Sequence, residues 1–129
     1  MAVKLYRVIC PVTNLDSAVD FYSEVLGFKG ERVSPGRHYF DCGGTILACY
    51  DPIADGDGPG DGWQHHFNQY IYISVDNLEA VYSRIESAGG EIEHAIENKP
   101  WGERIFYAKD PSGNPISFVD ENTVFKGSG

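Results

Sequence analysis

Hydrophobic and polar positions alternate along residues 4–12 with the period of a β-strand. The two faces of this predicted strand differ in character. The apolar face carries Val8, Cys10 and Val12, and the mixed face carries Arg7, Ile9 and Pro11. Proline cannot donate a ladder hydrogen bond, so Pro11 is expected near a strand end or edge.

The spacing changes to that of a helix over residues 15–26. Apolar residues recur there every three to four positions. They are Leu15, Ala18, Val19, Tyr22 and Leu26. Asn14 or Asp16 is expected to cap the helix at its N-terminus, and Gly27 to end it. Strand patterns over 28–33, 37–41 and 45–50 complete a β-α-β-β-β unit.

Residues 51–66 interrupt this regular pattern. Glycine, proline and aspartate dominate the first twelve of them, so this segment is interpreted as a linker. Its Asp-Gly-Asp-Gly run is compatible with a calcium loop. However, Pro59 stands where an EF-hand loop has Asp or Asn, and no Glu closes the loop.

The chain after the linker repeats the order of the first half. Strands are predicted at 68–75, 91–97, 103–109 and 115–120, and a helix at 78–88. Residues 12–28 and 75–90 can be aligned at an offset of 63, which pairs Val12 with Val75, Asn14 with Asn77 and Gly27 with Gly90. Such an internal repeat predicts a fold made of two similar halves.

The domain organisation follows from this repeat. We expect a single domain over 1–125, made of module 1 (1–50), the linker (51–66) and module 2 (67–122), with a frayed tail at 123–129. A length of 129 residues fits one such domain.

Composition excludes several classes of function. The net charge of −9 disfavours nucleic acid as a partner. No apolar run approaches the ~18 residues of a membrane span, and no signal peptide is visible, so a cytoplasmic protein is expected. The three cysteines, Cys10, Cys42 and Cys49, lack the spacing of a metal site or disulfide framework and are expected to be reduced thiols.

At the level of motifs, the chain resembles the vicinal oxygen chelate superfamily, which includes glyoxalase I, the extradiol dioxygenases and the bleomycin-resistance proteins. The resemblance rests on residues 12–28, on 75–78 with 88–90, and on 99–118. It implies an α+β fold in which two βαβββ modules form a curled mixed sheet around a cup-like cavity. It also implies homodimers. Because this fold supports unrelated activities, function has to be argued from the site.

In metal-dependent members of that superfamily, each module supplies one ligand from its first strand and one from its last. The matching positions here are Arg7, Ala48, Tyr70 and Ser117. None of these is a usual ligand for a divalent cation, which needs imidazole, carboxylate or thiolate donors. The sequence therefore predicts that the metal centre of the superfamily is absent and that no cofactor is bound.

Strand alternation predicts which residues face the cup. Small-molecule pockets are usually lined by apolar and aromatic side chains with a few polar groups. The ligand-binding residues predicted on this basis are Arg7, Ile9, Tyr50, Tyr70, Tyr72, Trp101 and Ser117. For Arg7, an internal carboxylate and an anionic group of a ligand are both possible partners. For Tyr70, Tyr72 and Trp101, plain packing is the alternative to ligand binding.

Three functions remain open from the sequence. The first is a metal-free protein that binds an aromatic or planar small molecule, for example a drug-sequestering protein. The second is a metal-dependent lyase, isomerase or dioxygenase, and the third is a metal-independent enzyme that uses Arg7, Tyr70 or Tyr72. The sequence leaves the roles of His38, His65 and His66, and of Trp63 at the end of the linker, undecided. Whether the modules pair within one chain or between two is also open.

Overall fold

The computed structural model describes residues 2–58, 66 and 68–126, and its elements follow the order β-α-β-β-β twice. The first module contains β1 (Arg7–Pro11), α1 (Leu15–Leu26), β2 (Glu31–Ser34), β3 (Arg37–Cys42) and β4 (Thr45–Tyr50). The second contains β5 (Ile71–Val75), α2 (Leu78–Arg84), β6 (Glu91–Asn98), β7 (Arg104–Lys109) and β8 (Pro115–Asp120). The predicted α+β fold of two βαβββ modules is confirmed.

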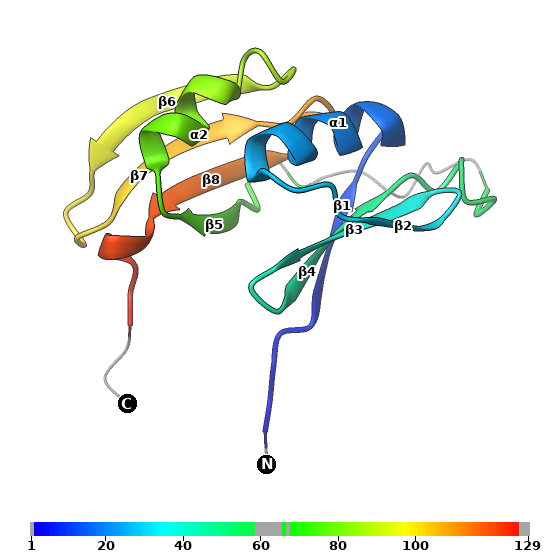
Figure 1. The fold of residues 1–129 in the computed structure, drawn as a ribbon, viewed down its shortest axis with the longest axis horizontal. Coiled ribbons are helices and arrows are strands. Elements are labelled where there is room, and N and C mark those ends of the chain that lie inside the picture. Colours follow the sequence, from blue (N-terminus) through cyan, green and yellow to red (C-terminus); the bar gives the residue numbers. More distant parts are fainter. Residues whose placement is uncertain (1, 59–65, 67, 127–129) are drawn as a thin grey trace.

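Each module forms its own four-stranded sheet. The strand orders are β1-β4-β3-β2 and β5-β8-β7-β6. In each sheet the first strand of the module is parallel to the last, and the other pairs are antiparallel. Both helices lie on the same side, and the two sheets diverge beneath them (Figure 1). The sheets are not joined, so β1 and β5 are both edge strands and the cup is not closed within the described chain.

The Asn-Leu pair that recurs in the sequence marks the start of both helices. The side-chain oxygen of Asn14 accepts a hydrogen bond from Ser17 N at 3.0 Å, and that of Asn77 accepts one from Ala80 N at 3.1 Å. Each asparagine thus satisfies a backbone donor that the helix itself leaves free. Asn14 is therefore the cap, and the Asp16 carboxylate instead pairs with Arg32 at the surface.

The two glycines that the repeat aligns serve different physical purposes. Gly27 ends α1 with a φ of 87°, which is the left-handed conformation that glycine adopts without strain. At Gly90 a Cβ atom would lie 2.6 Å from the Phe21 ring and 2.8 Å from the Lys109 carbonyl oxygen, so close packing between the modules requires glycine there. The helix predicted over 78–88 is wrong in its length: it ends at Arg84, and the chain continues to Gly90 through hydrogen-bonded turns.

One hydrophobic core spans both modules. Its largest fully buried side chains come from α1 and from strands of both sheets, and they are Phe21, Tyr22, Phe40, Phe106 and Phe118. The predicted inward faces are confirmed for Cys10 and Val12, which are buried in this core. Val8 differs, because it is half-buried beside the open edge of β1.

The tail is partly ordered by hydrogen bonds. A short 3₁₀ helix (Glu121–Thr123) follows β8, and the hydroxyl oxygen of Thr123 accepts a hydrogen bond from Arg104 N at 3.0 Å. The prediction that fraying begins at residue 123 is therefore wrong for Thr123. No helix in the described ranges is both long and apolar enough to cross a membrane.

A buried carboxylate, Asp110, connects the two modules. It lies in the turn between β7 and β8, and one of its oxygens accepts hydrogen bonds from the Tyr22 hydroxyl at 2.7 Å and the Cys10 thiol at 3.5 Å. Burial raises the pKa of Tyr22 well above its ordinary value, so this hydroxyl stays protonated and donates. Both donors belong to module 1, whereas the acceptor belongs to module 2.

The same turn makes further contacts that complete this connection. The other Asp110 oxygen accepts hydrogen bonds from Ser112 N and Asn114 N, both at 2.9 Å. The Asn114 amide donates to Asp110 at 2.9 Å and to the Pro11 carbonyl oxygen, at the end of β1, at 2.7 Å. We call Asp110, Asn114, Tyr22 and Cys10 the Asp110 joint.

We expect Asp110→Asn to lower the free energy of unfolding by about 3 kcal/mol, because an amide nitrogen cannot accept the hydrogen bonds that one carboxylate oxygen accepts now. Tyr22→Phe removes a single donor and should cost about 1–2 kcal/mol. Urea titrations followed by circular dichroism measure both values. Asp20→Asn on the exposed side of α1 is the control and should change stability by less than about 0.5 kcal/mol. A loss of under about 1 kcal/mol in Asp110→Asn would contradict the joint's role.

Candidate functional site

The face of each sheet that is turned away from the helices is called its cup face below. On the first sheet, strand register places Ile9 beside Ala48, and Ala48 beside Tyr39. Arg7 and Tyr50 project to the same side, because side chains two residues apart on a strand share a face. The predicted cup-facing positions of Arg7, Ile9, Ala48 and Tyr50 thus lie together on module 1.

Arg7 is held by two tyrosines. Its Nη1 donates a hydrogen bond to the Tyr39 hydroxyl at 2.8 Å. Its guanidinium carbon lies 5.6 Å from the centre of the Tyr39 ring and 5.5 Å from that of Tyr6, which is within cation–π range. Within residues 2–58, 66 and 68–126, no carboxylate forms an ion pair with Arg7. An internal acidic partner, one of the two possibilities for this residue, is therefore not found there.

Tyr50 is buried beside the first part of the linker. Its hydroxyl donates to Asp57, and this hydrogen bond, with burial, raises the pKa of Tyr50. Arg37 forms an ion pair with Asp55 and a longer one with Asp57 at 3.8 Å, and its guanidinium lies 4.5 Å from the centre of the Tyr50 ring. These carboxylates thus fold residues 51–58 back onto module 1. Their ion pairs with Arg37 also argue against the calcium-loop alternative.

The cup face of the second sheet is aromatic. Tyr70 and Tyr107 pack edge to face with ring centres 5.4 Å apart, and the Tyr70 hydroxyl donates to Glu93 at 2.9 Å. Burial, with this hydrogen bond, raises the pKa of Tyr70. Tyr72 lies opposite Ser117 in the strand register, and its side chain is 54% exposed.

Trp101 extends this surface from the turn before β7. The residue is 63% exposed, and its Nε1 donates to Glu103 at 2.7 Å. The Lys99 ammonium lies 5.8 Å from the centre of the Trp101 ring and 5.2 Å from that of Tyr107. The indole is thus oriented by its neighbours but not packed in the core, and one face of it can accept a flat molecule.

The histidines have different surroundings. His38 is buried, with Nε2 2.7 Å from the Lys29 carbonyl oxygen and Nδ1 accepting from Arg32 at 3.3 Å, so its ring is fixed by contacts within module 1. His94 packs edge to face with Tyr107 on the second cup face. His66 accepts a hydrogen bond from Asn68 N. His65 and Trp63 fall outside the described residues.

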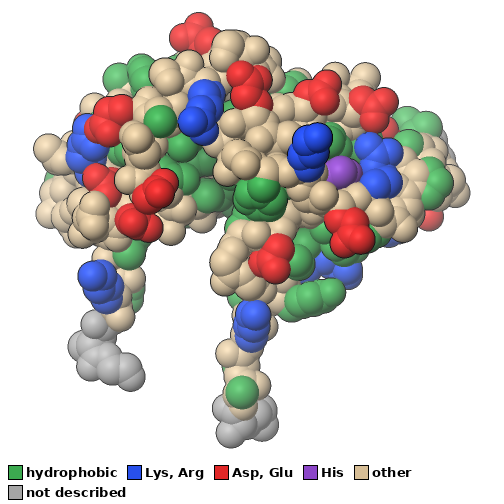
Figure 2. All heavy atoms as spheres, viewed as in Figure 1, with side chains coloured by type: hydrophobic (Ala, Val, Ile, Leu, Met, Phe, Trp, Pro, Cys, Tyr) green, Lys and Arg blue, Asp and Glu red, His purple; other side chains and the backbone are tan. Residues whose placement is uncertain are grey.

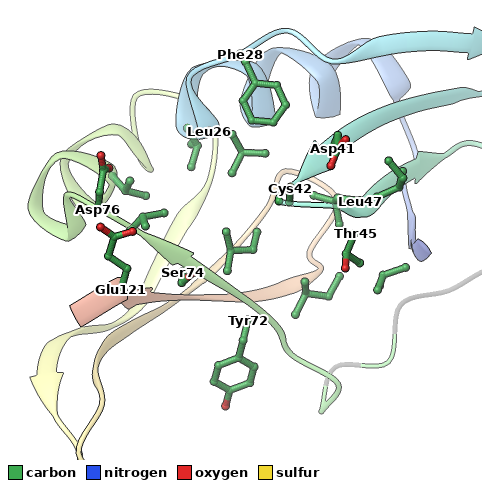
Figure 3. A pocket seen from close by; sticks show the side chains of 18 of the residues that line it. Leu26, Phe28, Asp41, Cys42, Thr45, Leu47, Tyr72, Ser74, Asp76 and Glu121 are labelled. Carbon is green, nitrogen blue, oxygen red and sulfur yellow. The ribbon is translucent and has the colours of Figure 1, made fainter. Parts of the chain in front are cut away.

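An open notch separates the two sheets below the helices (Figure 2). Its volume is about 1040 Å³, and the open edge of β5 forms one side of it. Leu26, Phe28, Cys42 and Thr45 line the other side (Figure 3).

Only two of the predicted ligand-binding residues line this notch, Tyr70 and Tyr72. Arg7, Ile9 and Tyr50 lie on the first cup face, Trp101 lies on the turn before β7, and Ser117 is buried in β8. The structure therefore brings the predicted residues together as two groups, one on each module, and not as one pocket within a chain.

Comparison with known proteins decides the family. A model of the Glyoxalase/Bleomycin resistance protein/Dioxygenase superfamily matches residues 4–118. The chain belongs to this superfamily. Its relatives include the uncharacterized protein YwbC of Bacillus subtilis, 26% identical over 92% of this chain and 98% of that protein. They also include a lactoylglutathione lyase of Escherichia coli O157:H7, 26% identical over 98% of this chain and 99% of the lyase.

Solved structures of superfamily members share the fold. A glyoxalase-related enzyme from Fulvimarina pelagi can be superposed with a TM-score of 0.77 at 17% sequence identity, covering 97% of this chain and 93% of the enzyme. At this identity the likeness extends to the fold alone. The superfamily resemblance drawn from the repeated motifs is thus confirmed.

The metal site that this superfamily implies does not fit the side chains present. Arg7 brings a positive charge and Ala48 brings no donor. The hydroxyl of Ser117 is buried and donates to the Phe106 carbonyl oxygen at 3.1 Å, while that of Tyr70 is committed to Glu93. In the described part of the chain no group of three His, Cys, Asp or Glu residues is arranged to hold a metal ion. No step of a mechanism can therefore be routed through a metal at these positions.

Sequence reasoning missed three residues that shape the two cup faces: Tyr39, Tyr107 and Glu93. Alternation could have indicated the tyrosines, because Tyr39 lies between the buried His38 and Phe40. Glu93 could not be placed in this way, since β6 is irregular between Ile92 and His94 and the strand period is interrupted there.

Proposed function

We propose that this superfamily member binds a planar aromatic small molecule on its cup faces. It does so without a metal ion and without catalysing a reaction of the ligand. The observation that carries the proposal is the chemistry of the four positions where metal-dependent relatives would place ligands. A cation, a methyl group and two hydroxyls already committed to internal acceptors replace them. Such a set cannot supply a Lewis acid, whereas the exposed guanidinium of Arg7 can orient a ligand.

The lining of the second cup face supports an aromatic ligand. The rings of Tyr70, Tyr72, Tyr107 and Trp101 offer flat apolar surface, while Lys99 and Glu93 offer polar groups at their margin. This mixture of aromatic surface and few polar groups is typical of small-molecule sites. A protein that sequesters a drug would need such a surface and no catalytic group.

We also propose that the protein is a homodimer in which a second copy covers the open notch. Support comes from the unpaired outer edges of β1 and β5, since open strand edges readily pair with another chain. Apolar side chains beside these edges are only partly covered; Leu5 is 69% exposed. A cytoplasmic location fits the three free cysteines.

Ligand binding can be followed through Trp101. After Trp63→Phe, Trp101 is the single tryptophan, because the sequence has two. We expect planar aromatic compounds to quench its fluorescence saturably. Tyr72→Ala should weaken the binding about fivefold, since a lost aromatic contact is worth about 1 kcal/mol.

Ile53→Ala, an exposed apolar truncation on the linker, is the matched control and should leave affinity unchanged. Absence of saturable binding by every planar compound tried, whether cationic, anionic or neutral, would contradict the proposed function. Turnover of lactoylglutathione by the protein would contradict its non-catalytic part.

The dimer can be tested at Leu5, which lines the notch without being buried in the described chain. Sedimentation velocity should show a dimer for the wild type, and Leu5→Asp should shift it towards monomer because an aspartate would be placed at the interface. Val3→Asp, two residues earlier and 89% exposed, is the control and should remain dimeric. A wild type that is monomeric at tens of micromolar would refute the homodimer.

A further inference from the structure

We propose that the Arg7–Tyr39 pair on the first cup face binds the carboxylate of an aromatic acid. This inference rests on the proposed function and adds the charge of the ligand and the residues that recognise it. Superfamily membership alone does not imply this carboxylate site, because metal-dependent members have a ligand for their metal ion at the position of Arg7.

Two arginines on the same face of the same sheet show the contrast that motivates the inference. Arg37 forms ion pairs with Asp55 and Asp57. Arg7 has no ion pair with any acid of the described segments, and its guanidinium donates instead to the Tyr39 hydroxyl. The charge of Arg37 is thus neutralised within the protein, whereas the charge of Arg7 is available to an anionic group of a ligand.

The pair is organised for a planar anion. The Tyr39 oxygen accepts from Arg7 at 2.8 Å, so the proton of its own hydroxyl remains to be donated. The guanidinium is held near the Tyr6 and Tyr39 rings, and no side chain among the described residues accepts a hydrogen bond from its other N–H groups. An arginine fork matches the two oxygens of a carboxylate, and a neighbouring hydroxyl adds a third donor.

An apolar surface for a ring lies beside this pair. Ile9 is the next residue on the face after Arg7 and is 37% exposed. The register joins it to Ala48 and then to Tyr39, so an isoleucine and a tyrosine flank a small alanine. Ala48 itself is fully buried, so a carboxylate on Arg7 would place its attached ring over Ile9.

Two acidic residues of this face, Asp41 and Glu31, form no ion pair with Arg7. Glu31 lies beside Tyr39 on the far edge strand, β2. Asp41 lies in the same row as Arg7 but two strands away, with Ile46 between them, which is about 10 Å. Its carboxylate accepts a hydrogen bond from Gly44 N at 2.7 Å and caps the turn between β3 and β4. Although the chain carries a net charge of −9, no acid of the described residues pairs with Arg7.

The test compares two ligands of one shape that differ in charge, 2-naphthoate and 2-naphthamide, by isothermal titration calorimetry. The wild type should bind the acid at least about tenfold more tightly than the amide. Arg7→Gln should weaken binding of the acid by about tenfold to a hundredfold and leave the amide unchanged. Tyr39→Phe should weaken binding of the acid by about threefold to tenfold.

Arg32→Gln is the matched control, since it removes the same charge from an exposed arginine that pairs with Asp16 at the surface. It should leave the affinity for the acid within about twofold. Unchanged binding of the amide shows that each variant is folded.

Two results overturn the inference while leaving the proposed function intact: equal affinity for acid and amide in the wild type, or an equal loss for both in Arg7→Gln. Failure of the acid, the amide and all other planar compounds to bind would instead reject the proposed function, and this inference with it.

Discussion

The arrangement of the two modules depends on the buried carboxylate of Asp110. It receives hydrogen bonds from a tyrosine of α1, a cysteine of β1 and its own β7–β8 turn, and Asn114 of that turn donates in addition to the end of β1. A buried charge is tolerated only when its partners are all in place. The joint therefore selects one orientation of module 2 on module 1, and the shared aromatic core packs around that orientation.

This orientation determines where a site can form. It places α1 and α2 together on one side and leaves the first strands of both modules as open edges (Figure 1). The predicted ligand-binding residues consequently lie on two separate cup faces, one with Arg7 and one with the tyrosines around Tyr107. A second copy that covers the notch would bring such faces towards each other, which is why ligand binding and dimerisation are proposed together.

Much of the fold could be predicted from the sequence, because each element had a local signal. The Asn-Leu pairs start both helices, and alternation assigned Cys10 and Val12 to the core. The site was less predictable. The Asp-Pro-Ser-Gly-Asn turn reads as an ordinary turn, and only the tertiary structure shows that Asp110 meets Tyr22, 88 residues away. Likewise, no pattern indicates that the linker carboxylates neutralise Arg37 but not Arg7.

We propose that this superfamily member binds a ligand through aromatic rings and an arginine in place of metal chemistry. The most direct measurement is elemental analysis of protein purified without a histidine tag, before and after incubation with excess zinc, nickel, manganese and ferrous iron. We expect no stoichiometric metal after dialysis in any of these samples. About one tightly held metal per chain would contradict it, because the side chains at Arg7, Ala48, Tyr70 and Ser117 could not then be the whole of the site.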